Sequence, residues 1–152
     1  MKYPEHRMKL AVFGSRSIHD DRAEAEISEF LHENPQYNVI VTSQEPKGVC
    51  SIAQQYAKKN SMVLELHFLN IKKHARGAWD HRSRHVVNAA DYVLLIHDGE
   101  SKGTQNELEL TKRCGKPHKY IVMDKSTELE REEHTDILRD IPDAAGGALP
   151  SS

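Results

Sequence analysis

The sequence is poor in aromatic residues and contains no long hydrophobic run. Five tyrosines, three phenylalanines and one tryptophan make up 6% of the 152 residues, which is few for a protein that stacks successive bases of a single strand. With a formal net charge of −2, single-stranded nucleic-acid binding is the least favoured function, and no nucleic-acid partner is expected. The apolar runs reach about five or six residues, far short of a membrane span, so no membrane partner is expected.

Cysteine is also scarce, with only Cys50 and Cys114 and no Cys-x-x-Cys motif. Residues 1–9 are charged and lack the apolar segment of a secretory signal. We therefore expect a reducing, cytoplasmic location, with both thiols buried in helices as small apolar side chains. His81 and His85 have the i, i+4 spacing of metal ligands, but a solvated pair explains them and no third ligand is nearby. No metal and no cofactor is predicted.

What the chain does contain is an alternation of short apolar runs and amphipathic segments. The runs predict strands over residues 8–13, 39–42, 62–68, 92–96 and 120–123. The segments between them predict helices over residues 20–33, 49–59, 78–88 and 104–113. This order predicts an α/β, Rossmann-like three-layer fold with a five-stranded parallel sheet and helices on both faces.

The charge distribution separates the body of the chain from its C-terminal part. Residues 124–152 carry eight acidic and three basic residues, which leaves residues 1–123 with a net charge of +3. We expect one Rossmann-like domain over residues 1–123, an acidic helical extension over 124–140 and a flexible tail over 141–152.

The loop after the first predicted strand is a candidate ligand site. Gly14 allows a close approach to the backbone, Ser15 offers a hydroxyl, and Arg16 offers a forked donor for phosphate. A tight turn with a solvated arginine explains the same spacing equally well. In parallel sheets such loops converge on one cleft at the carboxyl ends of the strands.

The loop after the fourth predicted strand is the second candidate. Gly103 and Thr104 open a helical pattern, so backbone N–H groups and the positive end of the helix dipole are available to an anion. Thr104 and Glu107 also form a capping box, which needs no ligand, and both roles can coexist. His97, at the end of the strand, could serve as an acid or base, although the following Asp98-Gly99 is equally a turn.

The order of these motifs resembles the SLOG superfamily of Rossmann-like nucleotide-binding proteins, with the YspA-like branch nearest. The resemblance covers roughly residues 8–123. It is carried by Gly14-Ser15-Arg16 after a strand, a second loop ending at Gly48, Arg82 in a helix, Ala90-Asp91 opening a strand, and Gly103-Thr104.

The resemblance implies a cleft that binds a nucleotide or nucleotide-derived ligand, as in a sensor, and a homodimer is compatible with it. The ligand-binding residues it suggests are Gly14, Ser15, Arg16, Thr42, Ser43, Gly48, His97, Gly103 and Thr104. The related LOG phosphoribohydrolases cleave the N-glycosidic bond of nucleoside monophosphates. By analogy with them, Glu107 would stabilise the developing oxocarbenium ion or hold the ribose hydroxyls, and Arg82 would assist as the second catalytic residue.

Overall fold

The computed structural model describes residues 7–124, and the extension and tail predicted beyond residue 124 lie outside this range. The strands are β1 (Met8–Gly14), β2 (Tyr37–Ser43), β3 (Val63–His67), β4 (Tyr92–His97) and β5 (His118–Val122). The helices are α1 (Asp21–Glu33), α2 (Gly48–Lys59), α3 (Ile71–His74), α4 (Ala78–Ala89) and α5 (Lys102–Arg113). None of the helices within residues 7–124 is long and apolar enough to cross a membrane.

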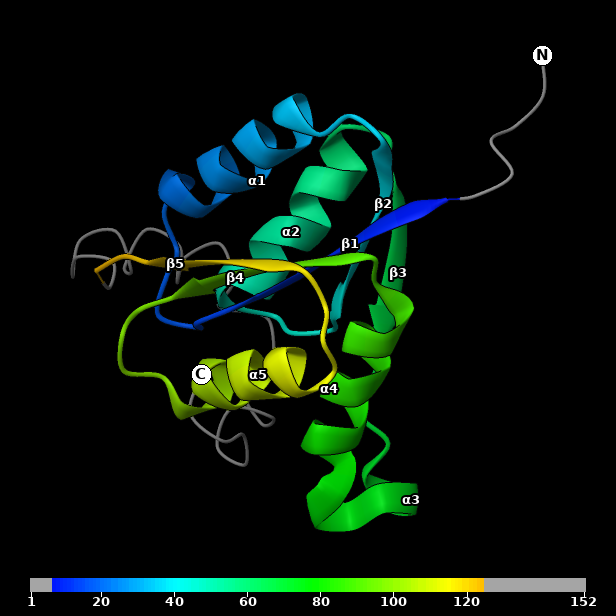
Figure 1. The fold of residues 1–152 in the computed structure, drawn as a ribbon. Helices are drawn as coiled ribbons and strands as arrows, with labels where there is room; N and C mark the ends of the chain where they lie inside the picture. Colours follow the sequence, from blue (N-terminus) through cyan, green and yellow to red (C-terminus); the bar gives the residue numbers. More distant parts are fainter. Residues whose placement is uncertain (1–6, 125–152) are drawn as a thin grey trace.

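The five strands form one sheet in the order β3-β2-β1-β4-β5, and every neighbouring pair is parallel (Figure 1). The predicted three-layer α/β fold is therefore confirmed. The chain builds outwards from β1 to β3 and then returns to place β4 on the other side of β1. The loops after β1 and β4 thus leave the sheet at the topological switch point, the place where the strand order reverses. Ligands bind at this point in folds of this kind.

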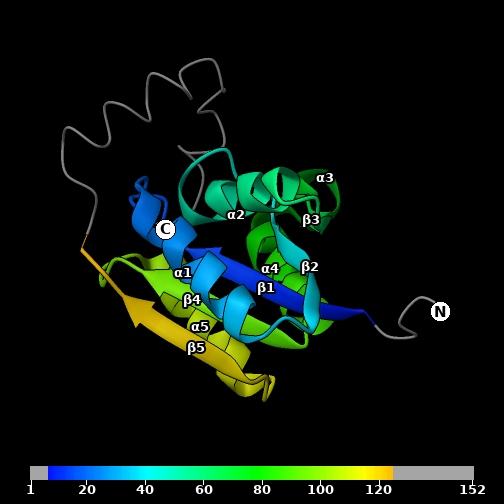
Figure 2. The ribbon, with the colours of Figure 1, turned by 90° about the horizontal axis from the view of Figure 1, so that it is seen from above.

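Alternate residues of the central strands feed two separate cores. Leu10 and Val12 of β1 pack under α1 and α2, whereas Ala11 and Phe13 pack against α4 and α5. Figures 1 and 2 show the corresponding layers, with α1 and α2 on one face of the sheet and α4 and α5 on the other. Burial on both faces explains why β1 reads as a continuous apolar run rather than an alternating one.

Residues 71–77, which lie outside the helices predicted from the sequence, fold into α3 and a short 3-10 turn, Ala75–Gly77. The Asn70 side chain accepts a hydrogen bond from the backbone N–H of Lys73 and so caps this single helical turn. The expectation for the cysteines is half wrong. Cys50 is buried in α2, but Cys114 is exposed because it lies past the last residue of α5, at its C-cap.

Candidate ligand-binding site

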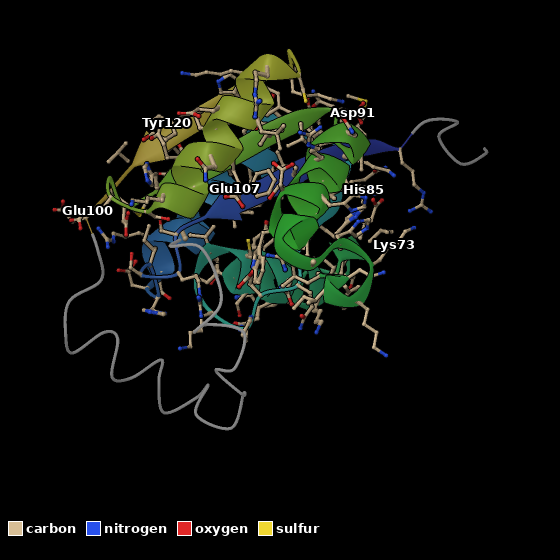
Figure 3. All side chains as sticks on the ribbon, turned by 90° about the horizontal axis from the view of Figure 1, so that it is seen from below. Lys73, His85, Asp91, Glu100, Glu107 and Tyr120 are labelled. Atoms are coloured by element: carbon tan, nitrogen blue, oxygen red, sulfur yellow. The ribbon has the colours of Figure 1, made fainter. Side chains whose placement is uncertain are left out.

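A cavity of about 230 Å³ opens at the carboxyl ends of β1 and β2, on the face of the sheet that α4 and α5 cover. Figure 3 views the molecule from that face, with Glu107 labelled on α5. The lining residues come from four segments that are distant in sequence. They are Gly14, Arg16, Ser43, Glu45, Lys47, Cys50, Trp79, Asp80, Arg82, Ser83, Gly103, Asn106, Glu107 and Leu110.

Six of the eleven residues singled out from the sequence line this cavity: Gly14, Arg16, Ser43, Arg82, Gly103 and Glu107. The loops after the first, second and fourth strands thus meet, as the topology requires. The other five residues, Ser15, Thr42, Gly48, His97 and Thr104, are not among the lining residues, and all of them are buried.

Two glycines allow α2 to approach the end of β1 closely. A Cβ on Gly14 would lie 2.3 Å from Cβ of Val49, and a Cβ on Gly48 would lie 2.4 Å from Cα of Arg16. Gly48 also has a φ of +76°, a conformation that other residues adopt only with strain. These glycines therefore let the start of α2 lie against the end of β1 and the loop that carries Arg16.

A buried hydroxyl pair joins the loops after β1 and β4. Ser15 Oγ accepts a hydrogen bond from the backbone N–H of Asp98 at 3.0 Å and lies 3.4 Å from Oγ1 of Thr104. Thr42 is likewise committed within the sheet, since its Oγ1 donates to the carbonyl oxygen of Val12 at 2.7 Å. Ser15 and Thr104 thus join the loops after β1 and β4, and Thr42 joins β2 to β1. These three residues stabilise the elements around the cavity without lining it.

The predicted capping box at Thr104 and Glu107 is wrong, because α5 begins two residues earlier. Ser101 is the N-cap, and its Oγ accepts from the backbone N–H of Thr104 at 3.3 Å. Gly103 and Thr104 consequently lie inside the first helical turn. Glu107 is thereby released from any capping role and lies in the second turn, where it lines the cavity.

His97 is engaged through both ring nitrogens. Nδ1 lies 2.6 Å from the Tyr120 hydroxyl and Nε2 lies 2.9 Å from the carbonyl oxygen of Ser101. Asp98 accepts hydrogen bonds from Ser17 and from two backbone N–H groups of its own loop, which, against the effect of burial, hold the pKa of Asp98 below its usual value. Glu100, labelled at the edge of Figure 3, is exposed. Neither of these acids lines the cavity.

An ion cluster forms one buried wall of the cavity. Arg82 is 6% exposed and Glu45 is 8% exposed. Nη2 of Arg82 donates to Oε2 of Glu45 at 2.5 Å, and Nε of Arg16 lies 4.0 Å from Oε1 of the same carboxylate. One carboxylate from the loop after β2 therefore faces guanidinium groups from α4 and from the loop after β1.

Sequence reasoning singled out Arg82 and Arg16 but missed Glu45, Lys47 and Trp79, all of which line the cavity. Glu45 and Lys47 belong to the loop after β2, which the parallel topology already directed to the same edge. Their charge in that loop was the available signal. Trp79 had no comparable signal, because its place depends on where α4 starts relative to the sheet.

Glu107 lies in an environment that favours its protonated form. Burial raises its pKa to about 8; Arg82 opposes the shift, Glu45 adds to it, and a hydrogen bond with Ser83 also opposes it. At neutral pH Glu107 is therefore a hydrogen-bond donor and adds no negative charge to the cavity. Burial likewise raises the pKa of Cys50 to about 12, so that its thiol stays neutral and poorly nucleophilic.

The first turns of three helices border the cavity: α2 through Cys50, α4 through Trp79 and Asp80, and α5 through Gly103. No side chain in the described part of the chain caps α2 or α4. Helix N-termini carry partial positive charge, so three of them reinforce the cationic side chains around the cavity. The site as a whole suits an anionic guest.

A stack of imidazoles lies outside this site. The ring centroids of His74 and His81 are 3.6 Å apart, and those of His81 and His85 are 4.3 Å apart. Burial and the neighbouring charges, led by His74, lower the pKa of His81. Within residues 7–124, no group of three or more histidine, cysteine or acidic side chains is arranged to hold a metal ion.

No protein-family model, curated protein or solved structure matches the chain. The resemblance to the SLOG superfamily therefore stays a prediction.

Proposed function

We propose that the cavity binds a nucleotide or nucleotide-derived ligand through its phosphate, as a SLOG-type domain would. The observation that carries the proposal is the convergence of three helix N-termini with Arg16, Lys47 and Arg82 on one cavity at the switch point. Glu45 and Asp80 offset two of these three positive charges, and Glu107 is neutral at pH 7. A net positive, partly enclosed site binds phosphate well.

The size and walls of the cavity favour a small nucleotide. A volume of about 230 Å³ lies below the range usual for drug-sized ligands and suits a mononucleotide better than a dinucleotide. Trp79 offers a ring against which a base can stack, and Gly103 lets a phosphate come close to the backbone of α5. The cavity therefore has a separate surface for each chemical part of the ligand.

Isothermal titration calorimetry with AMP, ADP-ribose and NAD tests this proposal. We expect AMP to bind, and we expect Lys47→Ala to weaken binding at least tenfold because a charge-assisted contact to phosphate is lost. The matched control is Lys58→Ala, which removes an exposed lysine at the far end of α2. The absence of heat from all three compounds at millimolar concentration would contradict the proposal.

One observation favours a second function, hydrolysis of the N-glycosidic bond of a nucleoside monophosphate. Glu107, with its pKa near 8, lies in the same cavity as Arg82. A protonated carboxyl can donate its proton to the departing base while water adds to C1′ of the ribose, giving free base and ribose 5-phosphate. The proton that the water loses restores Glu107.

Chromatography of the reaction products tests the hydrolase proposal. We expect free base from at least one monophosphate, and its loss in Glu107→Gln. Glu109→Gln changes an exposed carboxylate on the same helix and should retain the activity. If the unmodified chain releases no base from any of the common monophosphates, the hydrolase proposal fails, while the binding proposal still stands on calorimetry.

A further inference from the structure

The end of β2 and the loop after it place at the cavity two polar groups that have no hydrogen-bond partner within residues 7–124. Oε1 of Glu45 accepts no hydrogen bond from the described residues, although Oε2 of the same carboxylate is held by Arg82. Oγ of Ser43, a residue only 1% exposed, also has no partner within residues 7–124. Buried polar groups without partners are costly, so such a pair beside a cavity points to a ligand that completes them.

The two groups are held in place by the backbone that carries them. Nε2 of Gln54 donates to the carbonyl oxygens of both Ser43 and Glu45, at 3.1 Å in each case. Ser43 is the last residue of β2 and Glu45 lies in the loop that follows, and both line the cavity. The shared donor therefore fixes the backbone of both residues, and their side chains line the same cavity.

The carboxylate in this pair of side chains, Glu45 and Ser43, does not suit a phosphate as the ligand group that they bind. A carboxylate repels a phosphate, so the phosphate belongs nearer to Lys47 and Gly103. Glu45 needs a neutral group that donates hydrogen bonds, and a hydroxyl next to Ser43 can be either donor or acceptor. Two adjacent hydroxyls on one sugar ring meet both requirements.

We infer that Glu45 and Ser43 bind the 2′- and 3′-hydroxyls of a ribose, so that the cavity selects ribonucleotides over deoxyribonucleotides. This inference rests on the proposed nucleotide binding and specifies its substrate class. A site built to bond a hydroxyl rejects the analogue that lacks it, because its own polar groups are then left unpaired. Water can partly satisfy Ser43 and Glu45 when a deoxyribose is bound, which reduces the discrimination without abolishing it.

The experiment compares calorimetric affinities of the full chain for four ribonucleoside 5′-monophosphates and their 2′-deoxy and 3′-deoxy analogues. For the base that binds best, we expect at least one deoxy analogue to bind tenfold or more weakly. Equal affinity for all three sugars would overturn the inference and leave the proposed nucleotide binding intact. Failure of every ribonucleotide to bind would overturn both.

Two variants separate recognition by this pair from a general loss of affinity. Ser43→Ala removes a hydroxyl that makes no hydrogen bond to the described part of the chain, so the variant should fold. We expect it to narrow the ratio of ribose to deoxyribose affinity several-fold. Glu45→Gln should narrow the same ratio. Ser51→Ala is the matched control, because Ser51 is a buried serine that does not line the cavity. This variant should leave the ratio of ribose to deoxyribose affinity unchanged. An unchanged ratio in well-folded Ser43→Ala and Glu45→Gln would refute the assignment of this pair.

Discussion

The raised pKa of Glu107 predicts how the stability of the folded protein changes with pH. Its ordinary pKa of 4.5 rises to about 8 in the folded protein, so the folded state holds a proton that the unfolded state has released. Between these two values the unfolded state binds fewer protons, and stability falls as the pH rises. The favourable contribution is fully present below about pH 4.5 and is lost by about pH 8.

Glu107→Gln replaces the carboxyl by a neutral group of the same shape. The variant therefore avoids the loss of stability that the unmodified chain suffers as the pH rises. Each unit of pKa shift corresponds to about 1.4 kcal/mol, so the variant should be more stable than the unmodified chain by up to about 3 kcal/mol at pH 7. At pH 8 and above the gain should reach at most about 5 kcal/mol. These are upper limits because the carboxyl is partly exposed at a cavity, where water screens it.

Urea unfolding of both proteins at intervals between pH 4.5 and pH 9 measures this difference. Comparing the two curves cancels the titration of every other group that the substitution leaves undisturbed. Glu109→Gln, on the exposed face of the same helix, should show no comparable gain. A difference between Glu107→Gln and the unmodified chain that does not change with pH would refute the reasoning, and so would a variant that is less stable at pH 8.

Three further predictions concern the frame of the site, each measured by urea unfolding. Gly48→Ala should cost roughly 2–4 kcal/mol, because its Cβ would collide with backbone and its φ is positive; Gly77→Ala, with open space around it, should be near neutral. Ser101→Ala should cost about 1 kcal/mol through loss of the α5 cap. Arg82→Met should cost about 3–5 kcal/mol by leaving Glu45 buried without its closest partner, and the added change Glu45→Met should recover much of that loss. Additive costs in the double variant would contradict this last prediction.

The sequence predicted the fold because its central strands are buried on both faces. The runs Leu10–Phe13 and Val93–Ile96 are continuous and apolar, so their length and surroundings identify them as strands. The apolar runs located the strands but not their ends: β2 begins at Tyr37 rather than at residue 39, and β5 begins at His118 rather than at Tyr120. The start of α5 was missed for a different reason, since Ser101 stands among polar residues where any of several could cap a helix.

The candidate site was only partly predictable because it depends on which loops become neighbours. Glycines with arginine nearby identified Gly14, Arg16 and Gly103 as candidates, and parallel topology brought them together. The pairing of Arg82 with Glu45 joins a helix to a loop 37 residues away, and no local pattern specifies it. Ser15 shows the converse case, since a residue type suited to phosphate binding can instead be used to join two loops.

The two glutamates of the cavity show how position, rather than residue type, assigns chemical roles. The carboxylate of Glu45 lies 2.5 Å from Nη2 of Arg82 and 4.0 Å from Nε of Arg16, so two guanidinium groups face it. Burial raises the pKa of Glu107 to about 8, so Glu107 carries a proton at pH 7 although the charge of Arg82 opposes the shift. One carboxyl group is thus a fixed acceptor and the other a donor within the same cavity. A ligand that offers hydroxyls to the first, an acceptor atom to the second and phosphate to the surrounding cations would satisfy all of them at once, and a ribonucleotide is a small molecule with these three parts.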